Sequence, residues 1–160
     1  MSSNHLSLPV FFFSTLQEPD LFYIAGWIAD ATGQSEDWYH HLHKLLIKQY
    51  KANKEFVAAA GTLQQMSWIA MAGDQRLFLL EVSTGGNIYV TGPSAIFNDP
   101  RLALAAWRRV IAHLRKIGIP YPIRTILDPS REIERGALKQ LGFKTDDQED
   151  EYGQKEYIYQ

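Results

Sequence analysis

Two kinds of apolar spacing alternate along the chain. Apolar residues three and four positions apart, as on a helix with one buried face, recur in four stretches. The predicted helices are residues 21–31, the stretch that begins at Ser35, the stretch between Asp99 and Gly118, and residues 131–141. The apolar face of the second is predicted to carry Trp38, Leu42, Leu45, Leu46 and Tyr50. Runs rich in β-branched and aromatic residues predict strands over residues 9–14, 67–72, 76–82, 87–91 and 123–127, and a hairpin of two strands within residues 144–160. Periodicity weakens after residue 51, so the secondary structure of residues 52–66 is left open.

Turn and cap residues set several of these boundaries. Asp99 followed by Pro100 is a typical helix start, because the carboxylate caps free N–H groups and proline suits the first helical position. Gly73 and its neighbours predict a tight turn, so residues 67–91 are interpreted as an antiparallel meander. The three consecutive phenylalanines at 11–13 predict a strand buried on both faces.

The order of these elements indicates the fold class. It is a strand, two helices, a three-stranded meander, a helix, a strand, a helix and two final strands. Mixed elements with mostly antiparallel pairing predict an α+β fold, an α/β sandwich in which helices flank a mixed sheet. A length of 160 residues favours a single domain over residues 1–160.

Composition narrows the classes of function. The chain has 16 Lys and Arg against 18 Asp and Glu, and this net charge of −2 disfavours a nucleic-acid protein that depends on a strongly basic surface. It has no cysteine, which excludes disulfides, thiolate metal ligands and a cysteine nucleophile. No stretch reaches the roughly 18 apolar residues of a membrane span, and the first residues lack a signal-peptide pattern. We therefore expect a cytoplasmic protein with neither a nucleic-acid nor a membrane partner.

Several polar side chains are candidates for chemistry, each with a simpler alternative. Glu81 lies in an apolar strand, where burial would raise its pKa and suit a general base, but strand alternation also allows a solvated carboxylate. His40 and His43 are one helical turn apart, but no third metal ligand accompanies them, which favours surface histidines. The third predicted helix is basic on its outward side, which suits a phosphate, a partner or solvent, through Arg108, Arg109, Arg115 and Lys116.

Two short motifs resemble the GNAT N-acetyltransferase superfamily. Residues 136–143, Gly-Ala-Leu-Lys-Gln-Leu-Gly-Phe, are similar to the superfamily's late helix, which ends in Leu-Gly-Phe. Residues 89–93, Tyr-Val-Thr-Gly-Pro, resemble its fourth strand and the proline that often follows. The resemblance implies a GNAT-like fold and acyl transfer from acetyl-CoA to an amine of a small molecule or peptide. It leaves a homo-oligomer open.

The resemblance also implies where site residues lie. Acetyl-CoA would bind beside the fourth strand and the loop after it, at Tyr89, Val90, Thr91, Ile96, Phe97, Asn98 and Arg101. Glu81 would be the general base, and Tyr157, at the acceptor end of the sheet, the proton donor. Cross-strand packing is the simpler interpretation of Tyr157.

Three features depart from the superfamily pattern. The loop of residues 94–101 contains no glycine, whereas the superfamily's loop cradles the pyrophosphate with glycine-rich backbone. Asp99 places a carboxylate there, and Leu138 stands where a tyrosine often acts as general acid. Two functions therefore stay open. One is an acyl-CoA-dependent N-acetyltransferase; the other is a GNAT-like binding or structural module without acetyl-CoA, as in the phage virion-associated proteins that the chain loosely resembles.

Overall fold

The computed structural model describes residues 8–60, 65–83, 87–119, 122–146 and 148–160, with backbone only for residues 54–60, 65 and 66. Its elements are β1 (Phe12–Thr15), α1 (Asp20–Thr32), α2 (Glu36–Ala60), β2 (Gln65–Ala72), β3 (Gln75–Ser83), β4 (Ile88–Thr91), α3 (Ser94–Phe97), α4 (Pro100–Lys116), β5 (Ile123–Leu127), the 3-10 turn η1 (Pro129–Arg131), α5 (Glu132–Leu141) and β6 (Lys155–Tyr159). The α+β class predicted from the sequence is confirmed.

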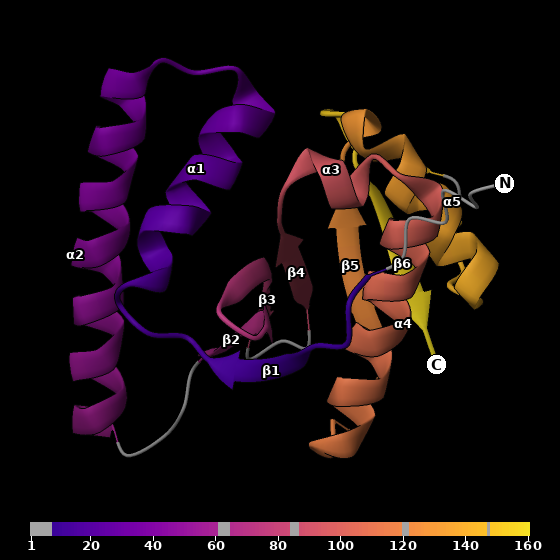
Figure 1. Cartoon of the computed structure of the whole chain (residues 1–160). Coiled ribbons are helices and arrows are strands. Elements are labelled where there is room, and N and C mark those ends of the chain that lie inside the picture. Colours follow the sequence, from indigo (N-terminus) through magenta and orange to yellow (C-terminus); the bar gives the residue numbers. More distant parts are fainter. Residues whose placement is uncertain (1–7, 61–64, 84–86, 120–121, 147) are drawn as a thin grey trace, which may run out of the picture.

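The strands form two antiparallel sheets (Figure 1). Strands β1, β2, β3 and β4 are neighbours in sequence order, which confirms the predicted meander, and β5 pairs with β6. Within the described residues, one parallel bridge between Asn87 and Arg124 links the two sheets. Gly73 has a φ of 60° in the turn after β2, a left-handed conformation that favours glycine.

Two apolar clusters pack on opposite faces of the larger sheet. Leu79 and Leu80 are adjacent on β3 and therefore point to opposite faces. Leu79 joins the smaller cluster, where Leu21 and Ile24 of α1 pack on the sheet. Leu80 joins the larger cluster, whose members include Trp107 of α4 and residues of α5. Helices α1 and α2 thus cover one face, and α4 and α5 cover the other.

Helices α1 and α2 form a hairpin held by specific contacts. A Cβ on Gly26 would lie 3.0 Å from Tyr39 Cε2, so glycine lets the helices approach closely. The Tyr39 hydroxyl donates a hydrogen bond of 2.7 Å to the Phe22 carbonyl. At the start of α1, the buried Asp20 carboxylate accepts a 2.7 Å bond from Arg76 Nε, which fixes the hairpin to β3.

Most predicted helix ends are confirmed by their caps. The Ser35 hydroxyl accepts a 3.3 Å bond from the Trp38 N–H at the start of α2. Gly142 has a φ of 103° and ends α5. Helix α2 continues to Ala60 and β2 begins at Gln65, so both parts of the open segment that the structure describes belong to regular elements.

Two predictions about packing are wrong. The strand with three phenylalanines is not buried on both faces: among the described strands β1 pairs with β2 alone, and Phe12 is 57% exposed. Leu45, predicted on the buried face of α2, is 49% exposed, and Ile47 contacts the smaller cluster instead. The first error arises because β1 lies at the edge of the described sheet, which a run of apolar residues does not reveal. The second arises because helical periodicity identifies the buried face only approximately.

Two predictions about local structure are also corrected. The prediction of two strands in the C-terminal hairpin is wrong. Among the described residues of 144–160 only β6 is a strand, and Lys144 forms a single antiparallel bridge with Ile158. Asp150 closes a turn before β6 by accepting bonds from the N–H groups of Tyr152 and Gln154, each 2.9 Å long. The loop expected at 94–101 contains helix α3 and the start of α4.

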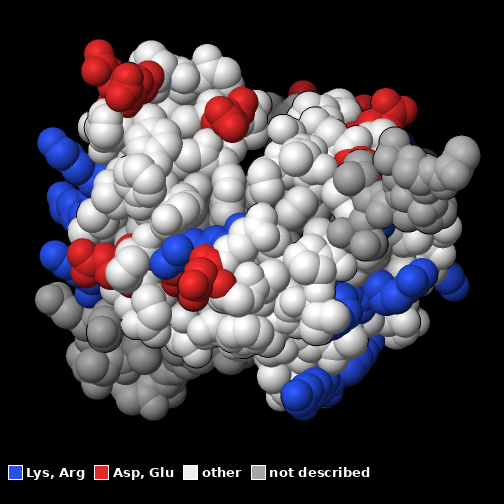
Figure 2. All heavy atoms as spheres, viewed as in Figure 1, with Lys and Arg blue, Asp and Glu red and all other residues white. Residues whose placement is uncertain are grey.

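Charged side chains are unevenly distributed over the surface. On the face shown in Figure 2, Lys and Arg gather over α4 at the lower right, and Asp and Glu mark the end of the α1–α2 hairpin at the upper left. None of the helices in the described part of the chain is long and apolar enough to cross a bilayer.

Candidate functional site beside strand β4

Strands β4 and β5 lie next to each other but belong to different sheets (Figure 1). Beyond the bridge from Asn87 to Arg124, no described residue of β4 pairs with β5. The β5 side of β4 therefore carries backbone groups without a strand partner. This unpaired side is where acetyl-CoA is expected.

Val90 presents its backbone to the unpaired side. The Ser83 N–H donates a 2.9 Å bond to the Asn87 carbonyl, so the odd-numbered residues of this segment bond to β3. Bonding direction alternates along an antiparallel strand, and the Val90 carbonyl therefore points away from β3 and toward β5.

Arg131 forms a hydrogen bond with this carbonyl. Its Nη2 donates a hydrogen bond of 2.9 Å to the Val90 oxygen. Arg131 closes the η1 turn that follows β5, so its side chain reaches from the end of β5 across to β4. An extended, amide-bearing ligand beside β4 would need the acceptor that Arg131 already uses.

A buried carboxylate holds Arg131 in place. Glu134 is 2% exposed and accepts bonds from Arg131 Nε at 2.6 Å and Trp107 Nε1 at 2.9 Å. Burial raises the pKa of Glu134, although the Arg131 charge and the hydrogen bonds from Trp107 and Arg131 oppose this increase. The sequence analysis missed this group. One signal in the sequence could have revealed it: Glu134 precedes Ala137 and Leu138 by three and four residues, which places it on the buried face of the helix.

The loop after β4 has no free backbone N–H between residues 96 and 103. Five backbone N–H groups donate to carbonyls three or four residues earlier in the chain. These donors belong to Ile96, Phe97, Asn98, Asp99 and Ala103. Asp99 Oδ1 accepts from the N–H of Arg101 at 2.9 Å and of Leu102 at 3.0 Å, and Pro100 has no N–H. A pyrophosphate held by backbone N–H groups does not fit these residues, because each donor has an acceptor and the Asp99 carboxylate occupies the helix start.

The predicted cofactor residues are divided between core and surface. Ile96 and Phe97 are 7% and 6% exposed and pack in the larger cluster. The Phe97 ring lies edge-on to Phe78 with centroids 5.6 Å apart, and Gly92 leaves room for it. Ile96 and Phe97 are therefore unavailable to a ligand, whereas the neighbouring Ser94, Ala95, Asn98 and Arg101 are exposed.

The two predicted catalytic residues lie on different faces. Glu81 is half-buried opposite Tyr89, on the same face of β3 as Leu79 and thus on the α1–α2 side. Tyr157 is 1% exposed and belongs to the larger cluster under α4 and α5. Leu138, in the position of the superfamily's tyrosine, is buried in the same cluster. The structure places Glu81 and Tyr89 together and keeps Tyr157 apart from them.

The histidines on α2 occupy ordinary packing positions. His40 lies 3.8 Å from Glu36, one turn away, and the His43 ring contacts Phe22 edge-on at 5.6 Å. Within the described residues, no group of three His, Asp or Glu side chains is arranged to hold a metal ion.

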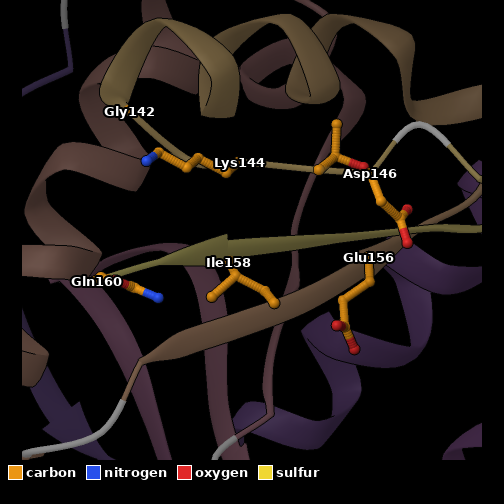
Figure 3. A pocket seen from close by; sticks show the side chains of 7 residues that line it. Gly142, Lys144, Asp146, Glu156, Ile158 and Gln160 are labelled. Carbon is orange, nitrogen blue, oxygen red and sulfur yellow. The ribbon is translucent and has the colours of Figure 1, made fainter.

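A shallow hollow of about 490 Å³ lies beside β6 (Figure 3). The Asp146 and Glu156 carboxylates lie at one end, and the Lys144 side chain extends toward the other end, where Gly142 and Gln160 lie. It is separate from the unpaired side of β4, and its exposed charges have opposite signs. It does not by itself define a ligand.

Comparison with known proteins identifies the fold. No family model and no curated protein matches the chain. A spermidine N-acetyltransferase chimera from Vibrio cholerae and hSSAT is 12% identical, with a TM-score of 0.65 over 93% of this chain and 94% of that one. RimL in complex with coenzyme A is 9% identical, with a TM-score of 0.65 over 91% of each chain. PaiA N-acetyltransferase from Thermoplasma acidophilum, also with coenzyme A, is 14% identical, with a TM-score of 0.60 over 94% of this chain and 99% of that one.

These similarities define a protein with the fold of the GNAT N-acetyltransferases, and they confirm the resemblance found in the sequence. At identities of 9 to 14% they establish the architecture. What the chain does must be argued from its own site.

Proposed function

We propose that this chain is a GNAT-fold binding module that does not use acetyl-CoA. The observation that carries the proposal is the internal use of every backbone N–H from residue 96 to residue 103. Phosphates bind at a helix start because its N–H groups are unsatisfied and its dipole is positive there. Here the Asp99 carboxylate serves as the bound anion, so a diphosphate would have to displace a covalently attached competitor of the same charge.

The contact between Arg131 and Val90 supports the same conclusion. A ligand laid along β4 would have to break a 2.9 Å hydrogen bond and move a guanidinium fixed by buried Glu134. Breaking a buried pair costs more than breaking a solvated one, because the remaining charge is left without a partner. The Val90 carbonyl and the backbone N–H groups of residues 96–103 are therefore already engaged within the chain.

Calorimetric titration tests the proposal. With acetyl-CoA and with coenzyme A at up to 1 mM, we expect no saturable heat and no increase in Tm of the purified chain. A ligand at 100 times its Kd would stabilise the folded state by about 2.7 kcal/mol, which a melting curve detects easily. Micromolar binding that weakens in Arg101→Ala, the exposed cation at the start of α4, would refute the proposal.

A second candidate is an acyl-CoA-dependent N-acetyltransferase that acts on a small-molecule or peptide amine. It is favoured by the lack of pairing between β4 and β5 and by Glu81 facing Tyr89 across β3 and β4. In this reading Glu81 is the general base, and Tyr157 the proton donor only if it becomes exposed. Acetyl transfer to a panel of polyamines and peptides, lost in Glu81→Gln with an unchanged Tm, would favour this candidate over the first.

A further inference from the structure

The β5–β6 sheet has one face that no described helix covers. On its other face, Ile123, Leu127 and Tyr157 are buried in the larger cluster with α4 and α5. The smaller cluster, in which α1 and α2 pack on the larger sheet, includes no described residue of β5 or β6. Side chains alternate between the faces of a strand, so the even-numbered residues of β5 and β6 lie on the uncovered side. With two residues of the adjoining segment they form what we call the open face: Arg124, Ile126, Lys144, Asp146, Glu156 and Ile158.

Charges of the same sign lie side by side on the open face. The strand register places Arg124 on one side of Ile158, and the bridge places Lys144 on the other. Figure 3 shows the Asp146 and Glu156 carboxylates together at one end of the hollow beside β6. Glu156 precedes Ile158 by two residues, which corresponds to about 7 Å along the strand. The open face therefore carries a basic row, Arg124 and Lys144, next to an acidic row, Asp146 and Glu156.

Pairing within the chain does not neutralise these rows. In the described part of the molecule, none of the four side chains forms an ion pair. Asp146 accepts a 3.0 Å hydrogen bond from the Gln148 N–H, which carries no formal charge. Like charges next to each other on a sheet destabilise it, whereas opposite charges stabilise it. A partner that offers each row the opposite charge would remove the repulsion within both rows.

The middle of the open face is apolar. Ile126 lies opposite Glu156 and is 36% exposed, and the partly exposed Ile158 lies between the two basic side chains. The solvated face of an antiparallel sheet usually carries polar residues at such positions. Two isoleucines within a ring of charged side chains instead give the arrangement of a protein interface, an apolar centre with a polar rim.

We propose that two copies of this chain associate through the open face about a two-fold axis. In such an interface the same surface contacts itself. An axis that lies in the interface, between the two rows and parallel to them, brings the acidic row of each copy onto the basic row of the other. A surface whose charges form two adjacent rows of opposite sign is therefore complementary to its own copy. The open face is separate from the unpaired side of β4, so the proposal does not depend on whether the chain binds coenzyme A.

The size of the open face sets the expected strength of this contact. Its six residues are fewer than the roughly 20 to 30 that each partner contributes to a stable complex. Exposed ion pairs are also screened by salt. We therefore expect a weak dimer whose population rises with protein concentration and falls with ionic strength.

Sedimentation velocity of the purified chain from about 5 to 500 µM tests the proposal. We expect dimerisation that weakens at least tenfold when salt is raised from 50 to 500 mM. An all-acidic face, Arg124→Glu with Lys144→Glu, should reduce self-association at least tenfold. An all-basic face, Asp146→Lys with Glu156→Lys, should do the same. A 1:1 mixture of these two double variants should form heterodimers at least as strong as the wild-type dimer, because both rows then face the opposite charge.

A matched control separates the open face from net charge. Lys44→Glu with Lys48→Glu, on the exposed side of α2, changes the net charge as much as the all-acidic variant does. This control should dimerise within twofold of the wild type. The Tm of every variant establishes that it is folded. If a double variant does not fold, the single substitutions Lys144→Glu and Asp146→Lys on exposed positions replace the pair, with the same pattern of loss and recovery.

Each outcome decides the proposal. Loss of self-association in both variants and its recovery in their mixture support it. A wild type that remains monomeric at 500 µM overturns it, as does an all-acidic variant that dimerises like the wild type, because the contact would then use another surface. A mixture that remains monomeric, or a control on α2 that weakens the dimer as much as the all-acidic variant, also overturns it.

Discussion

The Arg131 guanidinium and the Val90 carbonyl, 41 residues apart in the sequence, are joined by a hydrogen bond of 2.9 Å. This bond connects β4 with the turn after β5. In the described structure, the backbone pairing on this side of β4 is the single bridge from Asn87, just before β4, to Arg124 of β5. Glu134 orients the guanidinium from below, and Trp107 orients Glu134. Side chains from α4, η1 and α5 therefore hold the contact to β4 at the place where a GNAT-like ligand is expected.

The first prediction concerns the buried hydrogen bond to Glu134. Trp107→Phe keeps the aromatic ring but removes the Nε1 donor, which leaves one carboxylate oxygen with an unmet bond. We expect a loss of about 1–3 kcal/mol in the free energy of unfolding, measured by urea denaturation. Trp38→Phe is the control, because the Trp38 ring nitrogen bonds to no described residue, and it should change stability by clearly less. Equal effects would mean that ring size rather than the bond matters.

The second prediction is a pH dependence caused by Glu134. Burial raises its pKa above the ordinary 4.5, so the folded protein holds this proton more tightly than the unfolded chain. The stability that this group contributes is fully present below pH 4.5 and is lost as pH rises through the folded-state pKa. Urea midpoints of the wild type and of Glu134→Gln, compared from pH 4 to pH 8, should diverge in that direction. Parallel curves would contradict the shift.

His113 should act in the opposite direction. Its pKa is lowered below 6.5, first by burial and then by the nearby Lys116 charge. The folded protein therefore binds this proton less readily than the unfolded chain, and stability falls as pH decreases from about 6.5 toward the folded-state pKa. The ring packs on Phe13 at 4.4 Å and on Trp68 at 4.9 Å. His113→Phe should retain these contacts and lose less Tm than the wild type between pH 7.5 and pH 5.

Gly92 should tolerate no side chain. A Cβ there would lie 2.4 Å from Phe97 Cε2 and 2.7 Å from Phe78 Cβ, next to the start of α3. Gly92→Ala should therefore cost about 1–3 kcal/mol by overpacking. Gly136→Ala is the matched control on helix α5: its Cβ would meet no atom within 4 Å, and alanine should stabilise the helix by about 0.5–1 kcal/mol. Destabilisation of similar size by both substitutions would argue against this packing.

Two substitutions of Asp99, the N-cap of α4, distinguish the effect of its charge from the effect of its hydrogen bonds. Asp99→Ala removes the acceptor for the N–H groups of Arg101 and Leu102 and should cost about 1 kcal/mol. Asp99→Asn keeps an acceptor and should remain close to the wild type. Thermal unfolding of both variants measures the difference. An equal loss in both would show that the carboxylate charge at the helix start matters more than its hydrogen bonds.

Much of the fold was accessible from local pattern. The meander from β2 to β4, the strand β5 and the capped helices α4 and α5 follow from alternation, turn glycines and Asp99, because these signals act over a few residues. The departures at 94–101 and Leu138 were also visible in the sequence. The C-terminal hairpin and the exposure of Phe12 were predicted wrongly, since pairing and edge position depend on distant segments.

The sequence by itself determined which residues form helices and strands and that Asp99 would stand at the start of α4. Only the tertiary structure decided which backbone hydrogen-bond donors and acceptors at the start of α4 and along β4 remain available to a ligand. The Arg131–Val90 bond and the Trp107–Glu134 bond join residues 41 and 27 positions apart, and such pairs have no local signature. The physical reason is that backbone hydrogen-bond donors and acceptors beside β4 are satisfied or left free by side chains that the fold brings from elsewhere.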